Sequence, residues 1–465
     1  MRKINKKVLW IIVISIFLFF PDSSVQAKFI KSFAVRIGGD NLKSGDEVRL
    51  AKYDIVLANK FHYDDINGDS WGAMKAINPN VKIYLYTIIN YVNSTHDAYG
   101  TVYLNELGRY GVSRGHSMGS LNGDNQDFFL LNSGNNRVVI SYDTNRYLLD
   151  FGSSSFRKYS SEATINDHVG QPWTADGVFS DHCWVIMSDT NSTPVRYNTD
   201  STWSSAMNGM IDFMTAALHD EGQKFAANRG LSFTESGYNA WLALDNVANP
   251  PDSALEEAGF VIKYGGGDVQ FFPEYKWKRE VDIMSNVSNY NVLNFSHTDI
   301  GPGGSGTDNW GKDFTFWDAL WFALGSYSIA KNDVDDNSYF GFGVGNYSTL
   351  SWFDEYDAMD GGNLDLGSAV GTYKISNING VNIYWRAFER GYVYVNPTPD
   401  NASSISLPEL CKELNYTNFK NDLTNIPDKN TISLNAHRAV FLYKSNAGLD
   451  PSSDAPFPPK GLIIR

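Results

Sequence analysis

The chain has very few cysteines, and this scarcity excludes one class of secreted protein. Only Cys183 and Cys411 are present among 465 residues. Two cysteines allow one bridge at most, so the fold cannot be a disulfide scaffold. A chain of this length can bury a sizeable core without such bridges. The sequence leaves open whether the two cysteines pair.

Motifs for metals, phosphates and nucleotides are also missing. No His-x-x-His or Cys-x-x-Cys spacing supports a metal site. The glycine-rich stretch at 301–306 lacks the Gly-Lys-Ser/Thr ending of a phosphate-binding loop, and no dinucleotide fingerprint follows the first predicted strand. We therefore expect neither a metal nor a cofactor.

Positive charge is in deficit. Lys and Arg number 38 against 52 Asp and Glu, which gives a formal net charge of -14. An acidic surface repels phosphate backbones and anionic lipid, so nucleic acid is an unexpected partner and a membrane surface is disfavoured.

Long apolar runs are absent except at the start. Basic residues in the first seven positions precede an apolar run at 8–20, and Val25-Gln26-Ala27 supplies small residues for cleavage. That order is typical of a secretory signal peptide over residues 1–27. A membrane anchor is the alternative, but the run is shorter than the ~20 residues that span a bilayer. We expect a secreted, extracellular chain that is free of the membrane after cleavage.

Aromatic residues, by contrast, are abundant. They make up 14% of the chain, with 12 Trp and 26 Tyr. Tyr and Trp pair an apolar face with a polar tip, which suits the C–H faces and hydroxyls of sugar rings. Large cores also use aromatics, so composition only favours a carbohydrate ligand.

Short apolar runs bounded by Gly, Asn, Asp or Pro alternate with helical patterns. Strands are predicted at 32–37, 53–58, 81–86, 175–182, 224–228, 254–260, 291–297 and 339–343. Eight strands, each followed by a helix or loop, predict an α/β fold, the (β/α)8 TIM barrel. An open doubly wound sheet is the alternative, which the missing dinucleotide fingerprint disfavours.

Three further segments complete the expected organisation. Residues 90–145 are rich in Asn, Gly, Ser and Tyr and predict an irregular insertion within a barrel over 28–365. From about 370 the pattern changes to strands alone, which predicts a small C-terminal antiparallel β-domain with a tail over 366–465.

Carboxylates follow two of the predicted strands. Asp181 ends the fourth strand, and Glu256 and Glu257 lie in the sixth. Active sites of such barrels lie at the carboxyl ends of the strands. Adjacent strand residues point to opposite sides, so only one of the two glutamates faces the barrel axis, and we favour Glu257. Two carboxylates are what cleavage of a glycosidic bond requires.

Other polar and aromatic residues on or near these strands are candidates for holding a sugar. Side chains that offer hydrogen bonds to hydroxyls are Asp54, Lys60, Asn228, Asn294 and His297. Indoles assigned to loops, where they can stack on sugar rings, are Trp173, Trp184, Trp241 and Trp310. For each, a structural role is the competing interpretation.

Three motifs resemble a known group of enzymes. They are Asp176-Gly177-Val178-Phe179-Ser180-Asp181, Asp252-Ser253-Ala254-Leu255-Glu256-Glu257, with Ser253 where glycine is usual, and the stretch from Tyr384 to Pro397. Together they resemble hypothetical glycosyl hydrolase family 15, whose members are barrel glycosidases related to endo-α-1,4-polygalactosaminidases. The resemblance implies hydrolysis of a polysaccharide or oligosaccharide with Asp181 and Glu257 as the catalytic pair.

Two other classes stay open from the sequence. A non-catalytic carbohydrate-binding or cell-surface protein on the same scaffold would keep the aromatic loops without needing both carboxylates. A polysaccharide deacetylase is the third option, which the missing metal motif disfavours. The sequence indicates nothing about the oligomeric state.

Overall fold

The fold is that of a computed structural model, which describes residues 29–38, 40–93, 128–187, 190–230, 232, 234–263, 268–345, 347 and 351–446. The predicted signal peptide, part of the predicted insertion and the predicted tail lie outside these residues.

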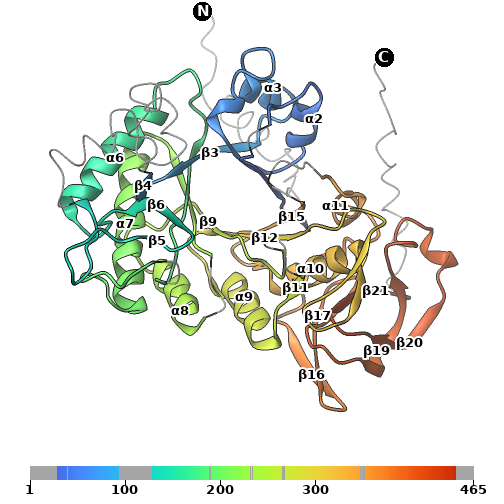
Figure 1. Cartoon of the computed structure of the whole chain (residues 1–465). Helices are drawn as coiled ribbons and strands as arrows, with labels where there is room; N and C mark the ends of the chain where they lie inside the picture. Colours follow the sequence, from blue (N-terminus) through green and yellow to red (C-terminus); the bar gives the residue numbers. More distant parts are fainter. Residues whose placement is uncertain are drawn as a thin grey trace, which may run out of the picture.

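Eight parallel strands form one sheet that curves into a barrel (Figure 1). In spatial order they are β1 (Phe33–Arg36), β2 (Ile55–Ala58), β3 (Lys82–Ile88), β7 (Gly177–Asp181), β8 (Lys224–Asn228), β9 (Ser253–Glu256), β12 (Asn291–Thr298) and β15 (Ser338–Val344). A parallel bridge between Ser32 and Phe340 joins the first strand to the last. The predicted (β/α)8 barrel is confirmed, and the open doubly wound sheet is wrong.

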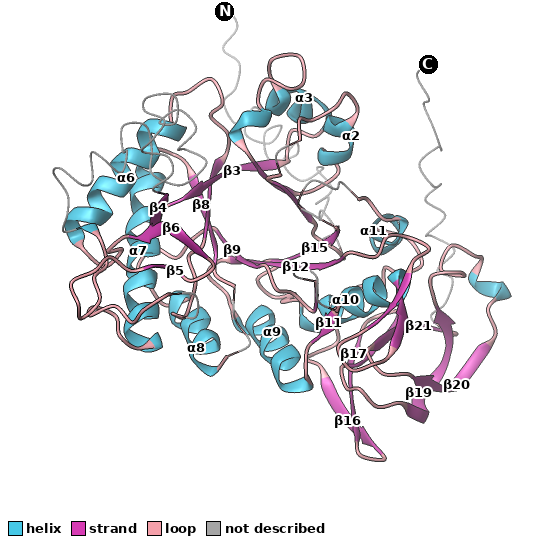
Figure 2. Cartoon of the chain, viewed as in Figure 1, coloured by secondary structure: helices cyan, strands magenta, loops and turns pink. Residues whose placement is uncertain are grey.

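Helices lie around the outside of this sheet, as the separate colours of Figure 2 show. They are α2 (Asp46–Leu50), α3 (Ser70–Ile77), α6 (Ser154–His168), α7 (Asp200–Asp220), α8 (Glu235–Leu244), α9 (Glu274–Asn286), α10 (Phe316–Ala330) and α11 (Asp354–Met359). The helix α7 begins at a capping box in which Thr199 and Thr202 satisfy each other's backbone N–H groups. Local capping therefore fixes where the chain turns into this helix.

Helix α10 is apolar on almost every side because it is covered twice. Nearly all of its side chains are buried, including Leu320, Phe322 and Leu324. It packs between the barrel and the C-terminal sheet, where Gly325 faces Ala439 and Val395 so closely that a β-carbon would lie 2.4 Å from Ala439. A helix that is hydrophobic all round is a buried helix, and this one joins the two parts of the molecule.

Three aspartates connect the amino ends of neighbouring barrel strands through the same kind of side-chain to backbone hydrogen bond. Asp54, Asp176 and Asp252 each stand just before a strand, and each accepts a backbone N–H from the start of the neighbouring strand, at 2.8 to 2.9 Å. Asp54 is thus at the end of the barrel opposite to the carboxyl ends, and its predicted role in binding substrate is wrong.

The chain leaves the barrel at three points. After β3, the strands β4 (Tyr91–Asn93), β6 (Asp143–Leu148) and β5 (Val139–Ile140) form a small antiparallel sheet. Hairpins β10 (Val261–Ile262) with β11 (Gln270–Phe271), and β13 (Ser305–Thr307) with β14 (Asp313–Thr315), follow β9 and β12. The predicted irregular insertion therefore has regular structure in its described part.

A six-stranded antiparallel sheet follows the barrel. Its members are β16 (Lys374–Ile378), β17 (Val381–Ala387), β18 (Gly391–Asn396), β19 (Ala402–Leu414), β20 (Asp428–Leu434) and β21 (Arg438–Lys444). The sequence did not predict β19, whose pairing with β20 shifts register twice and breaks the alternation of apolar and polar residues. Arg386 of β17 joins the two parts by donating to the carbonyl oxygen of Lys331, at 2.7 Å.

Both cysteines are free and buried, Cys183 beyond β7 and Cys411 in β19. Within the described ranges, no helix is both long and apolar enough to cross a membrane.

Candidate functional site

The candidate site is built by residue parity along four neighbouring strands. Successive side chains of a strand point to opposite faces, so residues two apart share a face. Apolar side chains that fill the barrel interior include Tyr84, Phe179, Ala226 and Leu255. Two residues beyond each of these, at the carboxyl ends of the strands, stand Tyr86, Asp181, Asn228 and Glu257. The pattern that fills the barrel thus also aims these four polar groups toward its axis.

Asp181 is held as an acceptor by three donors. The Tyr86 hydroxyl donates to its Oδ2 at 2.8 Å, the backbone N–H of His182 donates to its Oδ1 at 2.8 Å, and the Asn228 amide donates to the same Oδ1 at 2.7 Å. These hydrogen bonds engage both oxygens of the carboxylate and fix its orientation. The Asp181 side chain retains 15% exposure, so solvent still reaches it.

A strained turn positions one of these donors. His182 has a φ of 57°, the left-handed region that costs a non-glycine residue about 1–2 kcal/mol. The Asn90 side chain donates to the carbonyl oxygen of His182 at 2.7 Å, and the His182 ring contacts the rings of Tyr91 and Trp184. These contacts hold a backbone conformation that turns the His182 N–H back onto the Asp181 carboxylate.

The surroundings of Glu257 disfavour its charged form. Burial first, and the negative charge of Asp181 second, raise the pKa of the Glu257 carboxyl to about 7. Hydrogen bonds from the Tyr347 hydroxyl and the Asn228 amide oppose that rise without cancelling it. Glu257 is therefore suited to hold a proton up to about neutral pH.

Asn228 sets the spacing of the pair. Its amide nitrogen donates to Oδ1 of Asp181 and to Oε2 of Glu257, at 2.7 Å each. The two accepting oxygens consequently lie no more than about 5.4 Å apart, twice the single bond length. Carboxyl groups separated by ~5–5.5 Å are typical of glycosidases that retain configuration, whereas inverting enzymes space them at ~6.5–9.5 Å.

Two tyrosines of this site escaped the sequence analysis. Tyr86 lies on a predicted strand, and the signal that points to it is its place two residues beyond the buried Tyr84. Tyr347 lies beyond β15, where the tertiary fold brings its hydroxyl to Glu257. No local pattern in the sequence connects residues 257 and 347.

Glu256 faces away from the barrel axis, so its predicted catalytic role is wrong. Its carboxylate accepts the backbone N–H groups of Ser232 at 3.0 Å and of Ala258 at 3.1 Å, and the side chain is only 3% exposed. Ser232 lies shortly after Asn228, and Ala258 directly follows Glu257. Glu256 thereby fixes the backbone beyond both of those residues and acts as a positioning group behind the site.

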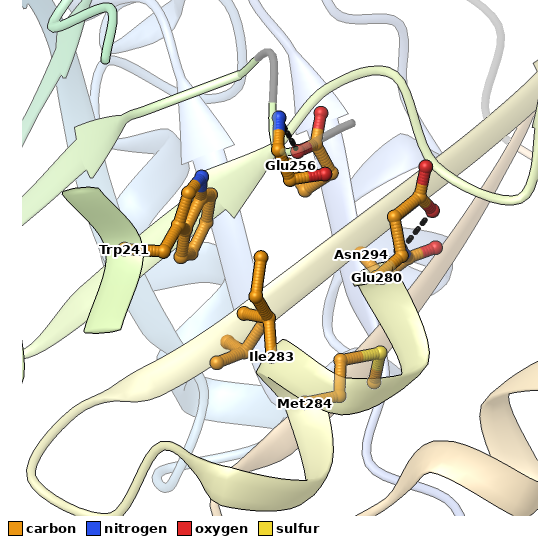
Figure 3. Close-up of a pocket in the computed structure, with 8 residues that line it drawn as sticks. Trp241, Glu256, Glu280, Ile283, Met284 and Asn294 are labelled. Atoms are coloured by element: carbon orange, nitrogen blue, oxygen red, sulfur yellow. Dashed lines mark hydrogen bonds between the residues drawn. The ribbon is translucent and has the colours of Figure 1, made fainter. Parts of the chain in front are cut away.

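Figure 3 shows Glu256 in a small buried pocket on the outer side of the sheet, with Trp241, Glu280 and Asn294 around it. Trp241 is fully buried in α8, and Asn294 of β12 is paired in register with Glu256 and donates to Glu280 at 3.3 Å. Burial, followed by the nearby Glu256, raises the pKa of Glu280 well above its ordinary value. The predicted contacts of Trp241 and Asn294 with substrate are wrong, because both side chains belong to the packing between sheet and helices.

Lys60 and Trp173 are also structural. The Lys60 ammonium is buried and forms an ion pair with Asp167 of α6 at 2.7 Å. Trp173 precedes β7, so it lies on the side where strands begin, and its ring nitrogen donates to the carbonyl oxygen of Asp167 at 2.9 Å. The expectation that these two bind substrate is wrong, because each is used to attach α6 to the barrel.

The remaining three candidates have different surroundings. Trp184 lies against the ring of His182, with centroids 4.4 Å apart, so it is close to Asp181. His297 follows Phe295 with the inward parity and lies near Tyr347; burial lowers its pKa to about 4, so it is neutral at ordinary pH. Trp310 lies in the turn between β13 and β14 and is 40% exposed. Its ring N–H donates to the carbonyl oxygen of Phe271, and within the described residues it makes no contact with the carboxylate pair. Of the three, Trp184 and His297 are near the pair.

Metal ligands do not gather in the part of the chain that the structure describes. No three His, Cys, Asp or Glu side chains there are placed to hold one ion. The expectation of a metal-independent site stays a prediction.

No family model and no curated protein matches the chain. Among solved structures, it is similar to the α-galactosidase AgaB from Geobacillus stearothermophilus, at 10% identity over 90% of this chain and 55% of that chain, with a TM-score of 0.43. It is also similar to the trehalulose synthase MutB from Pseudomonas mesoacidophila MX-45, at 10% identity over 91% of this chain and 100% of that chain, with a TM-score of 0.46.

A third similar structure is the isomaltulose synthase SmuA from Protaminobacter rubrum, at 12% identity over 91% of this chain and 100% of that chain, with a TM-score of 0.46. The chain spans about half the length of the α-galactosidase. These similarities identify neither a family nor an activity, and the resemblance to hypothetical glycosyl hydrolase family 15 stays a prediction.

Proposed function

We propose that this protein is a secreted glycoside hydrolase that cleaves a polysaccharide or oligosaccharide with retention of configuration. The proposal rests mainly on the Asn228 amide, which holds Oδ1 of Asp181 and Oε2 of Glu257 within about 5.4 Å of each other. Their different environments supply the two roles that such a reaction requires.

In the first step, Asp181 is the nucleophile and Glu257 the general acid. An Asp181 oxygen attacks the anomeric carbon as the bond to the leaving oxygen breaks, and the proton of Glu257 moves to that oxygen. The products are a glycosyl ester on Asp181, an ionised Glu257 and the released alcohol. The donors on Asp181 orient its carboxylate for the attack.

In the second step, the ester is hydrolysed. Ionised Glu257 takes a proton from a water molecule, the resulting oxygen attacks the anomeric carbon, and Asp181 leaves as a carboxylate. Two inversions give net retention, and Glu257 ends protonated as it began. The Asn228 amide contacts both carboxylates, so it is placed to follow the shift of charge between them.

Product stereochemistry tests the proposal. The mature protein should release reducing ends from at least one member of a panel of microbial and plant polysaccharides. Proton NMR during the first minutes should show the new hemiacetal in the configuration of the bond that was cleaved. Initial release of the opposite anomer would contradict the retaining mechanism, and binding of a glycan without any release would favour the non-catalytic alternative.

The pH dependence follows from the raised pKa of Glu257. The general acid must be protonated, so kcat/KM should fall tenfold per pH unit above about pH 7. Removing the charge of Asp181 takes away the second cause of the shift. In Asp181→Asn, a carbon-13 NMR titration should therefore find the Glu257 pKa lower than in the wild type but still above 4.5, because burial remains. An unchanged pKa would show that the two carboxyls do not interact.

A further inference from the structure

A second hollow lies where the barrel meets the C-terminal sheet. It encloses about 800 Å³ and is lined by aromatic and basic side chains from segments far apart in the sequence. The rings are those of Trp317, Trp352 and Tyr416, and the basic groups are those of Arg49, Lys52 and Lys420. Arg49 belongs to α2 and Trp317 to α10, Trp352 precedes α11, and Tyr416 and Lys420 follow β19. In Figure 1, α10 and α11 lie beside the C-terminal sheet. We call this hollow the junction groove; none of the groups that contact Asp181 or Glu257 lines it.

The rings of the junction groove are fixed before any ligand arrives. Trp317 and Tyr416 stack in parallel, with centroids 5.9 Å apart and planes 8° apart. Trp352 donates its ring N–H to Asp357 at 3.1 Å and packs edge to face on Tyr53. Rigid rings lose little conformational entropy on binding, which favours a ligand that stacks on them.

Part of the aromatic surface of the junction groove is accessible to solvent. Tyr416 is 43% exposed although its ring stacks on Trp317. The turn that carries it is closed by Asn415, whose side-chain oxygen accepts the backbone N–H of Thr417 at 2.9 Å. The exposed phenol is therefore a built feature of the loop, and it presents an apolar face with a polar edge to the groove.

The charge of the junction groove is opposite to that of the chain as a whole, which is -14. Lys52 lies 4.9 Å from the centre of the Trp352 ring and forms no ion pair within the described residues. Arg49 is 65% exposed and reaches Asp46 only at 3.8 Å. Two cations are thus available beside the rings.

Two acidic residues also line the groove, but neither cancels these cations. Asp354 forms its ion pair with Lys420. Glu355 is buried, accepts the ring N–H of Trp321 at 3.1 Å, and has a pKa raised by that burial. The remaining balance is positive, provided by Arg49 and Lys52.

We infer that the junction groove is a binding site for an anionic glycan, separate from the carboxylate pair. A pyranose ring stacks on the aromatic surface at Tyr416, and a carboxylate or sulfate on the glycan contacts Arg49 and Lys52. Neutral sugars would use the rings but not the cations, so the site discriminates by charge. The inference does not depend on the proposed catalytic function.

Calorimetric titration of oligogalacturonate into the Asp181→Asn protein at low salt tests this site. Each uronate ring offers both a face for stacking and a carboxylate. Binding should weaken roughly tenfold or more in Arg49→Gln/Lys52→Gln, the loss expected when charged hydrogen bonds are removed. It should also weaken in Tyr416→Ala. The control Lys82→Gln/Lys158→Gln makes the same change in net charge at exposed positions outside the groove and should bind as the parent does.

Two further arms make the result decisive. Oligogalacturonate methyl ester has the same rings without the charge and should bind at least tenfold more weakly, and added salt should weaken only the charged ligand. The inference is overturned by an absence of binding, by equal binding of the ester, or by groove variants that bind like the parent. Each arm uses the Asp181→Asn protein, so the results stand whether or not the wild type hydrolyses a glycan.

Discussion

Asp181→Asn should lower kcat by roughly 10⁴- to 10⁶-fold, the loss seen when the nucleophile of an enzyme is removed. Asparagine keeps the volume of the side chain but forms no glycosyl ester, so the first step has no attacking group. It also replaces one of the two acceptor oxygens by an amide N–H₂, which then faces either the Tyr86 hydroxyl or the two donors His182 and Asn228. Release of reducing ends measures the effect, with thermal unfolding to show that the fold is retained.

The matched control for this variant is Asp220→Asn, an exposed aspartate in the last turn of α7. It makes the same chemical change away from the carboxylate pair and should leave kcat unchanged. If Asp181→Asn is folded and retains more than about one per cent of wild-type kcat, Asp181 is not the nucleophile.

The partner variant Glu257→Gln separates the two roles. A general acid contributes about 10²- to 10⁴-fold, and only where the leaving group needs a proton. Hydrolysis of a natural glycosidic bond should therefore fall by that factor. The kcat/KM for release of an acidic phenol from an aryl glycoside of the same sugar reports only the first step, so it should change little. Equal losses on both substrates would indicate that Glu257 has a different role.

The largest expected effect on stability comes from Arg229→Ala. Arg229 directly follows Asn228 and is fully buried, and burial lowers its pKa to about 10. Its guanidinium donates to the carbonyl oxygen of Cys183 at 2.8 Å and to the side chain of Asn208 at 2.6 Å. Alanine leaves a cavity and two buried acceptors without donors, which should cost about 3–5 kcal/mol in the free energy of unfolding.

Arg229→Met serves as the comparison because it keeps the volume and removes the buried charge. Its cost should be smaller, about 1–2 kcal/mol, since only the unsatisfied acceptors remain. Urea unfolding of both variants at one pH gives the two free energies. Equal losses in the two variants would show that the filled volume contributes nothing at this position.

Sequence reasoning located the carboxylate pair because strand order and strand parity are local properties. Short apolar runs bounded by Gly, Asn, Asp or Pro identified the fourth and sixth strands, and a (β/α)8 barrel places the carboxyl ends of all its strands at one mouth. That rule brought Asp181 and Glu257 together across more than seventy residues of sequence. It also favoured Glu257 over Glu256, because adjacent residues of one strand cannot face the same side.

The same reasoning failed where a strand's exact start mattered. Asp54, included in a strand predicted over 53–58, lies just before β2 and fastens the opposite end of the barrel. Trp241 and Trp173 were assigned to βα loops but lie in a helix and in the connection that precedes β7. An error of one residue in a strand's start, or one helix that is not recognised, therefore assigns a side chain to the mouth of the barrel when it lies at the base or in the core.

What the sequence alone determined is the class of fold, the antiparallel sheet at its C-terminal end and the two carboxylates at the mouth. Only the tertiary structure decided that Asn228 joins them, that Tyr347 contacts Glu257, and that burial raises the pKa of Glu257 to about 7. The reason is physical. Periodicity records which side of an element is buried, whereas a hydrogen bond between distant loops and the pKa of a buried acid depend on neighbours in space, which the order of residues does not list.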